Sequence, residues 1–117
     1  MSVLDISLIS LNFDVLILAP VIPKIIVKTE AVDNYCKKNQ FEPDFIKIDC
    51  EGAELNVLKG LKKTIKSKAL KSILIEINPN FKEHQKCVKI LLKEFSNYKK
   101  INVIKNSNIH NIVFSRI

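Results

Sequence analysis

The stretch DFIKIDCEGAELNVLKG, residues 44–60, joins a short apolar strand to an amphipathic helix through a turn crowded with acids. It holds four acidic residues and both glycines of the chain within seventeen positions. Phe45–Ile48 is typical of a buried strand, and apolar residues recur at helical spacing over residues 52–67. A strand that leads directly into a helix predicts a layered α/β fold, with acids at the carboxyl end of the strand.

The flanking segments continue this alternation. Apolar runs predict strands at residues 25–27, 72–77, 100–104 and 109–115, and apolar stripes predict helices near residues 29–39 and 80–97. The run SILIEI, residues 72–77, is typical of a strand covered on both faces. The turn-rich KNSN between the last two strands predicts an antiparallel hairpin at one sheet edge. We therefore expect an α/β fold with a mostly parallel sheet that ends in this hairpin.

Four residues are expected to shape the helices. Thr29 is a candidate N-cap of the first helix, and Asn80 with Glu83 is a candidate capping pair for the third. Gly60 falls inside the second predicted helix, where glycine costs about 1 kcal/mol relative to alanine. Close packing of that helix against the sheet is the expected reason for the glycine.

The composition excludes several classes of function. A length of 117 residues fits one small domain, and 47% hydrophobic with 26% charged residues excludes a disordered chain. The net charge of +7 comes from scattered lysines, with Arg116 the single arginine, whereas nucleic-acid binders concentrate basic residues and rely on arginine. We therefore expect no nucleic-acid partner, and a basic surface that docks onto nucleic acid or anionic lipid is the weaker alternative.

The cysteines and the amino-terminal segment bear on location. The three cysteines form no CxxC pair, which favours a reducing compartment and hence a cytoplasmic protein. Residues 1–23 are apolar, but Asp5 and Asp14 interrupt them, and no stretch reaches the ~18 uninterrupted apolar residues of a membrane span. We expect no membrane span and interpret this segment as one or two core strands.

Residues 44–60, followed by ILIEI at residues 73–77, resemble the signature of the FkbM-type S-adenosylmethionine-dependent methyltransferases. That signature runs approximately as Ile-Lys-Ile-Asp-Val-Glu-Gly-Ala-Glu, then an apolar helix ending in Gly and an apolar strand ending in Glu. AVDNYC, residues 31–36, also resembles an upstream element of the family, and the whole resemblance covers about residues 25–116. Cys50 replaces the usual Val, and the matching residues are Ile46, Lys47, Ile48, Asp49, Glu51, Gly52, Ala53, Glu54, Leu55, Leu58 and Gly60.

The resemblance implies a partial Rossmann-like methyltransferase sheet and methyl transfer from S-adenosylmethionine to a hydroxyl of a sugar or other small metabolite. Such enzymes hold the cofactor in a glycine-rich turn, and the only glycines here are Gly52 and Gly60. We interpret residues 25–117 as the carboxyl-terminal half of such a domain and residues 1–24 as an apolar segment of uncertain role. The cofactor-binding residues stay unassigned, and the chain alone should bind the cofactor weakly or not at all. A non-catalytic remnant, or a half-domain that needs a partner chain with the cofactor-binding half, is the alternative.

The candidate site lies where two strands end, because ligands of open α/β sheets bind beyond the carboxyl ends of the strands. By resemblance, Asp49 and Glu51 are the catalytic candidates, since a carboxylate beside the acceptor hydroxyl can orient or deprotonate it. Asp49 could instead cap the following helix. Acids in a first helical turn also gain about 0.3–1 kcal/mol from the helix dipole, which would explain Glu51 without any ligand.

Four further residues are candidates for binding the acceptor: Glu54, Glu76, Asn78 and His84. Glu54 stands at the head of the apolar helical stripe, where an acid needs a partner or a ligand. His84 is either a general base or a half-buried structural histidine. Asp49 with Glu76 and Asn78 could form a hard-oxygen magnesium site, but three ligands from two strand ends do not suffice to assign a metal.

Overall fold

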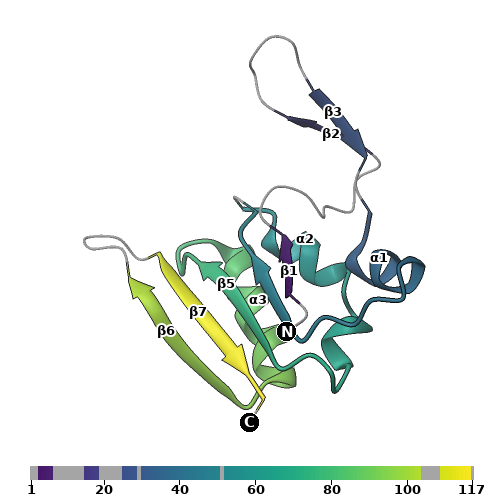
Figure 1. The fold of residues 1–117 in the computed structure, drawn as a ribbon. Coiled ribbons are helices and arrows are strands. Elements are labelled where there is room, and N and C mark those ends of the chain that lie inside the picture. The colour runs from purple at the N-terminus through teal and green to yellow at the C-terminus, as the bar shows by residue number, and fades with distance from the viewer. Residues whose placement is uncertain are drawn as a thin grey trace.

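The computed structural model describes residues 3–6, 15–18, 25–28, 30–50, 52–103 and 109–116. The helices and strands follow one another along the chain as Figure 1 shows. Their bounds are β1 Val3–Ile6, β2 Val15–Leu18, β3 Ile25–Lys28, α1 Val32–Lys38, β4 Phe45–Ile48, α2 Glu54–Lys59, the 3-10 helix η1 Thr64–Lys66, β5 Ser72–Ile77, α3 Lys82–Glu94, β6 Asn97–Val103 and β7 His110–Ser115.

The main sheet has five strands in the order β1-β4-β5-β7-β6. The pairs β1–β4 and β4–β5 are parallel, whereas β5–β7 and β7–β6 are antiparallel. The expected parallel pairing is therefore confirmed for β4 with β5, and the predicted terminal hairpin is confirmed as well. The sheet is mixed rather than mostly parallel, because the hairpin adds its two strands in antiparallel orientation.

The amino-terminal strands depart from the expected order. The predicted strand at residues 25–27 forms as β3, but it pairs with β2 in a separate two-stranded antiparallel sheet. The parallel neighbour of β4 is β1, whose Ile6 is only 2% exposed. The prediction of core strands within residues 1–23 is thus correct for β1. A boundary after residue 24 stays a prediction.

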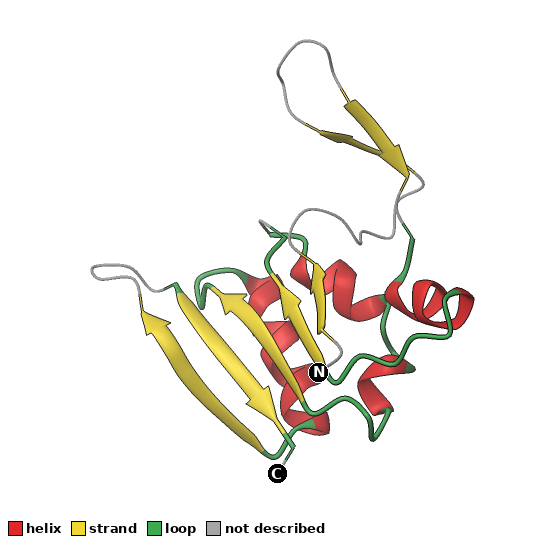
Figure 2. Ribbon diagram, in the orientation of Figure 1, coloured by secondary structure: helices red, strands yellow, loops and turns green. Residues whose placement is uncertain are grey.

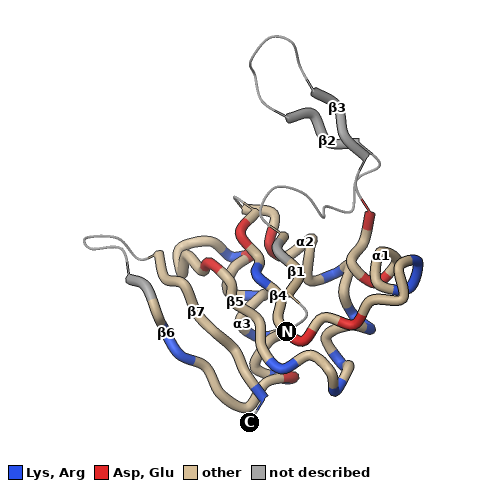
Figure 3. Tube along the Cα trace, in the orientation of Figure 1, with Lys and Arg blue, Asp and Glu red and all other residues tan. Residues whose placement is uncertain are grey.

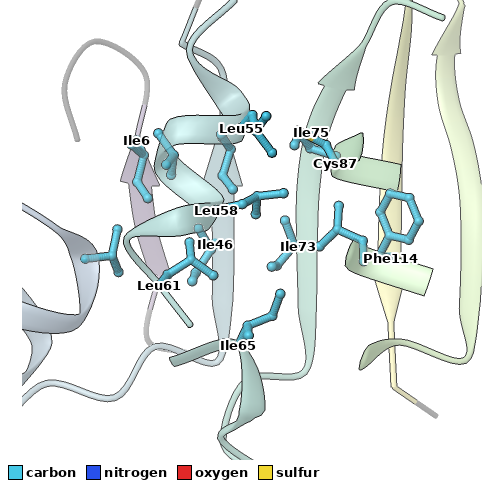
Figure 4. Packing of buried hydrophobic residues seen from close by; sticks show 14 of the residues in the cluster. Ile6, Ile46, Leu55, Leu58, Leu61, Ile65, Ile73, Ile75, Cys87 and Phe114 are labelled. Atoms are coloured by element: carbon cyan, nitrogen blue, oxygen red, sulfur yellow. The ribbon is translucent and has the colours of Figure 1, made fainter. Parts of the chain in front are cut away.

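Strands β4 and β5 bury alternate residues against α2 and α3. Ile46 and Ile48 on β4, like Ile73 and Ile75 on β5, are at most 1% exposed. Figure 4 shows these strands meeting Leu58 of α2. The intervening residues of β5 are only half-buried, and Figure 2 shows α2 and α3 on the same side of the sheet. Among the described residues, the helices therefore cover β5 on one face only, whereas its apolar run predicts cover on both.

The second helix ends earlier than its apolar pattern predicts. α2 stops at Lys59 with Gly60 as its C-cap, so the glycine ends the helix rather than lying inside it. The carboxylate of Asp33 explains the break, because it accepts the amide N–H groups of Lys63 and Thr64 at 2.9 and 2.8 Å, and the Thr64 hydroxyl at 2.6 Å. These bonds hold the start of η1 against α1 and redirect the chain.

The predicted side-chain caps are absent from the described helices. α3 begins after Phe81 without a side-chain cap, so the Asn80–Glu83 capping pair is wrong. Asn80 lies one residue too early, and its amide donates to the Asn78 side-chain oxygen at 3.0 Å. The first helix begins after Ala31, also without a side-chain cap. Thr29, the candidate there, lies outside the described residues.

Arg116, the single arginine, connects three segments of the chain just after β7. Arg116 donates to the carbonyls of Leu70 and Glu94, each at 2.8 Å, and to the carbonyl of Ile65. Its guanidinium also lies 4.6 Å from the ring centroid of Phe95. A planar group with several fixed donors suits this position, because three separate segments each present a backbone carbonyl here.

Candidate functional site

The candidate site begins at the carboxyl ends of β4 and β5. Ile48 pairs with Ile75, so Asp49 lies one step past the paired residues, level with Glu76. The Asp49 amide donates to the Ile6 carbonyl at 2.9 Å, which carries the extended backbone one residue beyond β4. Because side chains alternate along a strand, Asp49 and Glu76 are directed away from the helix-covered face. Acidic residues at these strand ends are visible in Figure 3.

Asp49 is half-buried, and its Oδ1 atom is enclosed without a hydrogen-bond partner among the described residues. The N-cap of α2 is Ala53, with no side-chain cap bond, so Asp49 does not cap that helix as the alternative interpretation required. A buried polar atom without a partner is rare in folded proteins and calls for an explanation. A carboxylate oxygen held ready for a ligand hydroxyl would supply one.

The carboxylate of Glu54, and not that of Asp49, accepts the backbone N–H groups of the turn after β4. Its Oε2 accepts the amide of Cys50 at 2.8 Å, and its Oε1 accepts the amide of Gly52 at 2.9 Å. Gly52 has a φ of +96°, a conformation that residues with a Cβ rarely adopt, and this allows the tight turn between β4 and α2. The carboxylate of Glu54, 0% exposed, thus fixes the turn that carries Asp49.

His84 is the third partner of Glu54. Its Nε2 lies 2.7 Å from Oε1 of Glu54, and its Nδ1 accepts the amide of Asn78 at 2.7 Å. A nitrogen that accepts an N–H carries no proton, so the proton of the neutral ring sits on Nε2 and points at Glu54. His84 is 4% exposed with both nitrogens engaged, so it is buried rather than half-buried.

The remaining predicted residues divide into two groups. Glu76 on β5 and Asn78 just after it are both half-buried at the end of the strand, and Asn78 also shapes the following turn. Glu51, the second catalytic candidate, lies outside the described residues. The structure thus brings Asp49, Glu76 and Asn78 to one end of the sheet, while Glu54 and His84 face each other in the interior.

Asn111 is a site neighbour that the sequence analysis did not identify. It pairs with Glu76 across β5 and β7, so both side chains lie on the same face of the sheet. The residue lies far along the chain, and only the register of the terminal hairpin brings it to this end. In the sequence, the position of Asn111 relative to Glu76 could have been found only by counting residues along the strands from the predicted turn of that hairpin.

Two kinds of chemistry find no support near the site. Burial, reinforced by the charge of Glu54, raises the pKa of the Cys87 thiol to about 12. This cysteine, about one turn along α3 from His84, therefore stays protonated at neutral pH. Within the described ranges, no group of three or more His, Cys, Asp or Glu residues is placed to hold a metal ion.

No helix among the described residues has the length and apolar character needed to cross a membrane.

The chain was compared with known families and proteins. The model of the methyltransferase FkbM domain matches residues 14–105, which is most of the sequence. No curated protein and no solved structure gave a match. The family match agrees with the strand–turn–helix unit that carries Asp49 and with the α/β sheet around it. The chain therefore belongs to the FkbM methyltransferase family.

Proposed function

We propose that this chain forms the acceptor side of an S-adenosylmethionine-dependent O-methyltransferase that acts on a hydroxyl of a sugar or other small metabolite. The observation that carries the proposal is the enclosed Oδ1 of Asp49 at the carboxyl end of β4, which has no hydrogen-bond partner among the residues that the structure describes. This is the position at which open α/β sheets present catalytic groups to ligands. Family membership supplies the reaction class.

Asp49 would hold the acceptor hydroxyl by a hydrogen bond and take its proton as the oxygen is methylated. The S-adenosylmethionine of the parent family supplies an electrophilic methyl group on a sulfonium. Glu76 and Asn78 would border the acceptor from the next strand, and Glu51 would assist Asp49. Glu54 and His84 are 0% and 4% exposed, so they would act on the acceptor through the turns that they hold. Positioning of this kind supplies much of the rate of a displacement reaction.

The residues present fit only part of a cofactor site. Both glycines lie within residues 44–60, and the amide of Gly52 is already bonded to Glu54. No glycine-rich turn is therefore available in this sequence to let a backbone approach the cofactor closely. We infer that such a turn comes from outside this sequence, as a partner half or a preceding segment. A remnant without catalytic activity is the alternative.

The test joins this chain to the glycine-rich half of a complete family member and measures methyl transfer to a panel of sugars and glycosides. The expected result is transfer by the fusion and its loss in Asp49→Asn. Glu42→Gln, an exposed acid before the opposite end of β4, is the matched control and should stay active. A fusion that binds S-adenosylmethionine but methylates nothing would favour the remnant. Micromolar cofactor binding by the chain alone, measured by calorimetry, would contradict the inferred missing turn.

A further inference from the structure

A cavity of about 430 Å³ lies between α3 and the β6–β7 hairpin, on the helix side of the sheet. Val88, Lys89 and Leu92 line it from α3, and Tyr98, Lys100 and Ile112 line it from the hairpin. We call this cavity the hairpin groove. Its volume falls within the roughly 300–1,000 Å³ of small-molecule pockets. It lies on the opposite face of the sheet from the side chains of Asp49 and Glu76.

The groove exists because the sheet is wider than its helical cover. Tyr98 and Lys100 pair with Phe114 and Ile112, so all four side chains share the face on which α3 packs. Phe114 and Ile112 are buried, yet Tyr98 on the outer strand is 58% exposed and Leu92 on α3 is 49% exposed. Large apolar groups left open beside a buried floor are a common feature of ligand grooves.

The walls of the hairpin groove favour one kind of occupant. The rings of Tyr98 and Phe114 lie 5.9 Å apart at an angle of 32° and form an aromatic wall for a flat or branched apolar group. The cationic side chains of Lys89 and Lys100 are exposed at the groove, and none of the described residues that line it is acidic. An apolar floor beside two unopposed positive charges complements an apolar molecule that carries a negative charge.

His110 gives a second, independent indication. It lines the same groove, and its Nδ1 is enclosed without a hydrogen-bond partner among the described residues. Buried polar atoms are nearly always paired, either with protein groups or with bound molecules. An unpaired ring nitrogen at the wall of an apolar cavity is the kind of group that a ligand with a polar end satisfies.

We propose that the hairpin groove binds a small amphiphilic anion, with a ring-sized apolar body against Tyr98 and Phe114 and its carboxylate or phosphate at Lys89 and Lys100. This site goes beyond the methyl-transfer role and does not depend on it, because it lies on the other face of the sheet. Ligand binding can therefore be measured on the chain as it is, with no cofactor and no acceptor.

The test is a nuclear magnetic resonance titration of the ¹⁵N-labelled chain with 4-phenylbutyrate and, separately, with phenyl phosphate. Saturable shifts are expected at amides around the groove, at ligand concentrations in the low millimolar range, because a ligand of this size gains little binding free energy. The double variant Lys89→Gln with Lys100→Gln should bind about three- to tenfold more weakly. Raising the salt concentration should weaken binding by the unmodified chain.

Two controls make the proposal falsifiable. Lys86→Gln with Lys93→Gln removes the same charge from exposed positions of α3 that do not line the groove, and this variant should bind normally. The neutral analogue 4-phenyl-1-butanol should bind at least threefold more weakly than 4-phenylbutyrate. Equal loss in both lysine variants, equal binding of the neutral analogue, or shifts that never saturate would each overturn the proposal. Preference for phenyl phosphate over 4-phenylbutyrate would identify the anionic group as a phosphate.

Discussion

The Nε2 atom of His84 lies 2.7 Å from Oε1 of Glu54, and this contact joins the turn after β4 to the first turn of α3. The amide of Asn78, at the end of β5, completes the connection by donating to Nδ1 of His84. Neither partner can move without leaving a buried polar group unpaired, which is costly inside a protein. The ends of the two central strands are therefore fixed relative to each other beneath the candidate site.

Glu54→Gln tests this connection. One carboxylate oxygen becomes an NH₂ group, so in either orientation of the amide at least one bound N–H faces a donor. The expected loss is about 1–3 kcal/mol in the free energy of unfolding, measured by urea denaturation. Glu83→Gln, an exposed acid at the start of α3, should change that free energy by less than about 0.5 kcal/mol. Equal effects of the two substitutions would refute the special role of Glu54.

Cys87 should lower the free energy of unfolding of the protein at alkaline pH. Its pKa is raised from 9.0 to about 12 by burial in the fold. Below pH 9 the thiol is protonated in both the folded and the unfolded chain, so it does not change stability. Above pH 9 only the unfolded thiol ionises, and stability falls toward pH 12. Unfolding free energies at pH 8 and pH 10 should therefore differ more for the unmodified chain than for Cys87→Ala. Identical differences would contradict the raised pKa.

Arg116→Lys should be destabilising although it conserves the charge. A single ammonium cannot bond the three carbonyls in the geometry of the guanidinium, and it loses the planar contact with Phe95. We expect a loss of about 2–3 kcal/mol in the free energy of unfolding. Lys99→Gln on the neighbouring strand β6, whose side chain is exposed, is the control and should have little effect. If Arg116→Lys left the free energy of unfolding unchanged, the three hydrogen bonds would contribute no net stability.

The central strand–turn–helix unit could be predicted because its signal is local. Apolar periodicity and the Gly52 turn are encoded within a few residues of each other. The position of β1 could not be predicted, because residues 3–6 and residues 25–28 are both short apolar runs and only tertiary packing decides which one joins β4. The early end of α2 depends on bonds from Asp33, some thirty residues away.

The candidate site was predictable in its location but not in its internal roles. The rule on carboxyl ends of strands identified Asp49, Glu76 and Asn78 without coordinates. The sequence could not show that Glu54 and His84 pair in the interior, because the two residues lie on different helices and their contact requires the folded sheet. A lone acid on an apolar helical stripe and a lone histidine on another are the signals that could have suggested the pair.

Asp49→Asn separates catalysis from structure. Asn keeps the size of the side chain but removes the negative charge. Asp49 makes no cap bond to α2, and its Oδ1 is enclosed without a partner among the described residues. The substitution should therefore leave the melting temperature unchanged or raise it slightly. In a fusion that carries a glycine-rich cofactor-binding half, methyl transfer should fall by about 10²–10⁴-fold, because the proton acceptor is lost.

Thermal melts and turnover are measured on the same preparations, with S-adenosylmethionine binding as a further readout. A drop in turnover with intact cofactor binding and melting temperature would assign the loss to proton transfer. A parallel drop in melting temperature would instead mean that Asp49 supports the fold, and unchanged turnover would remove it from the reaction.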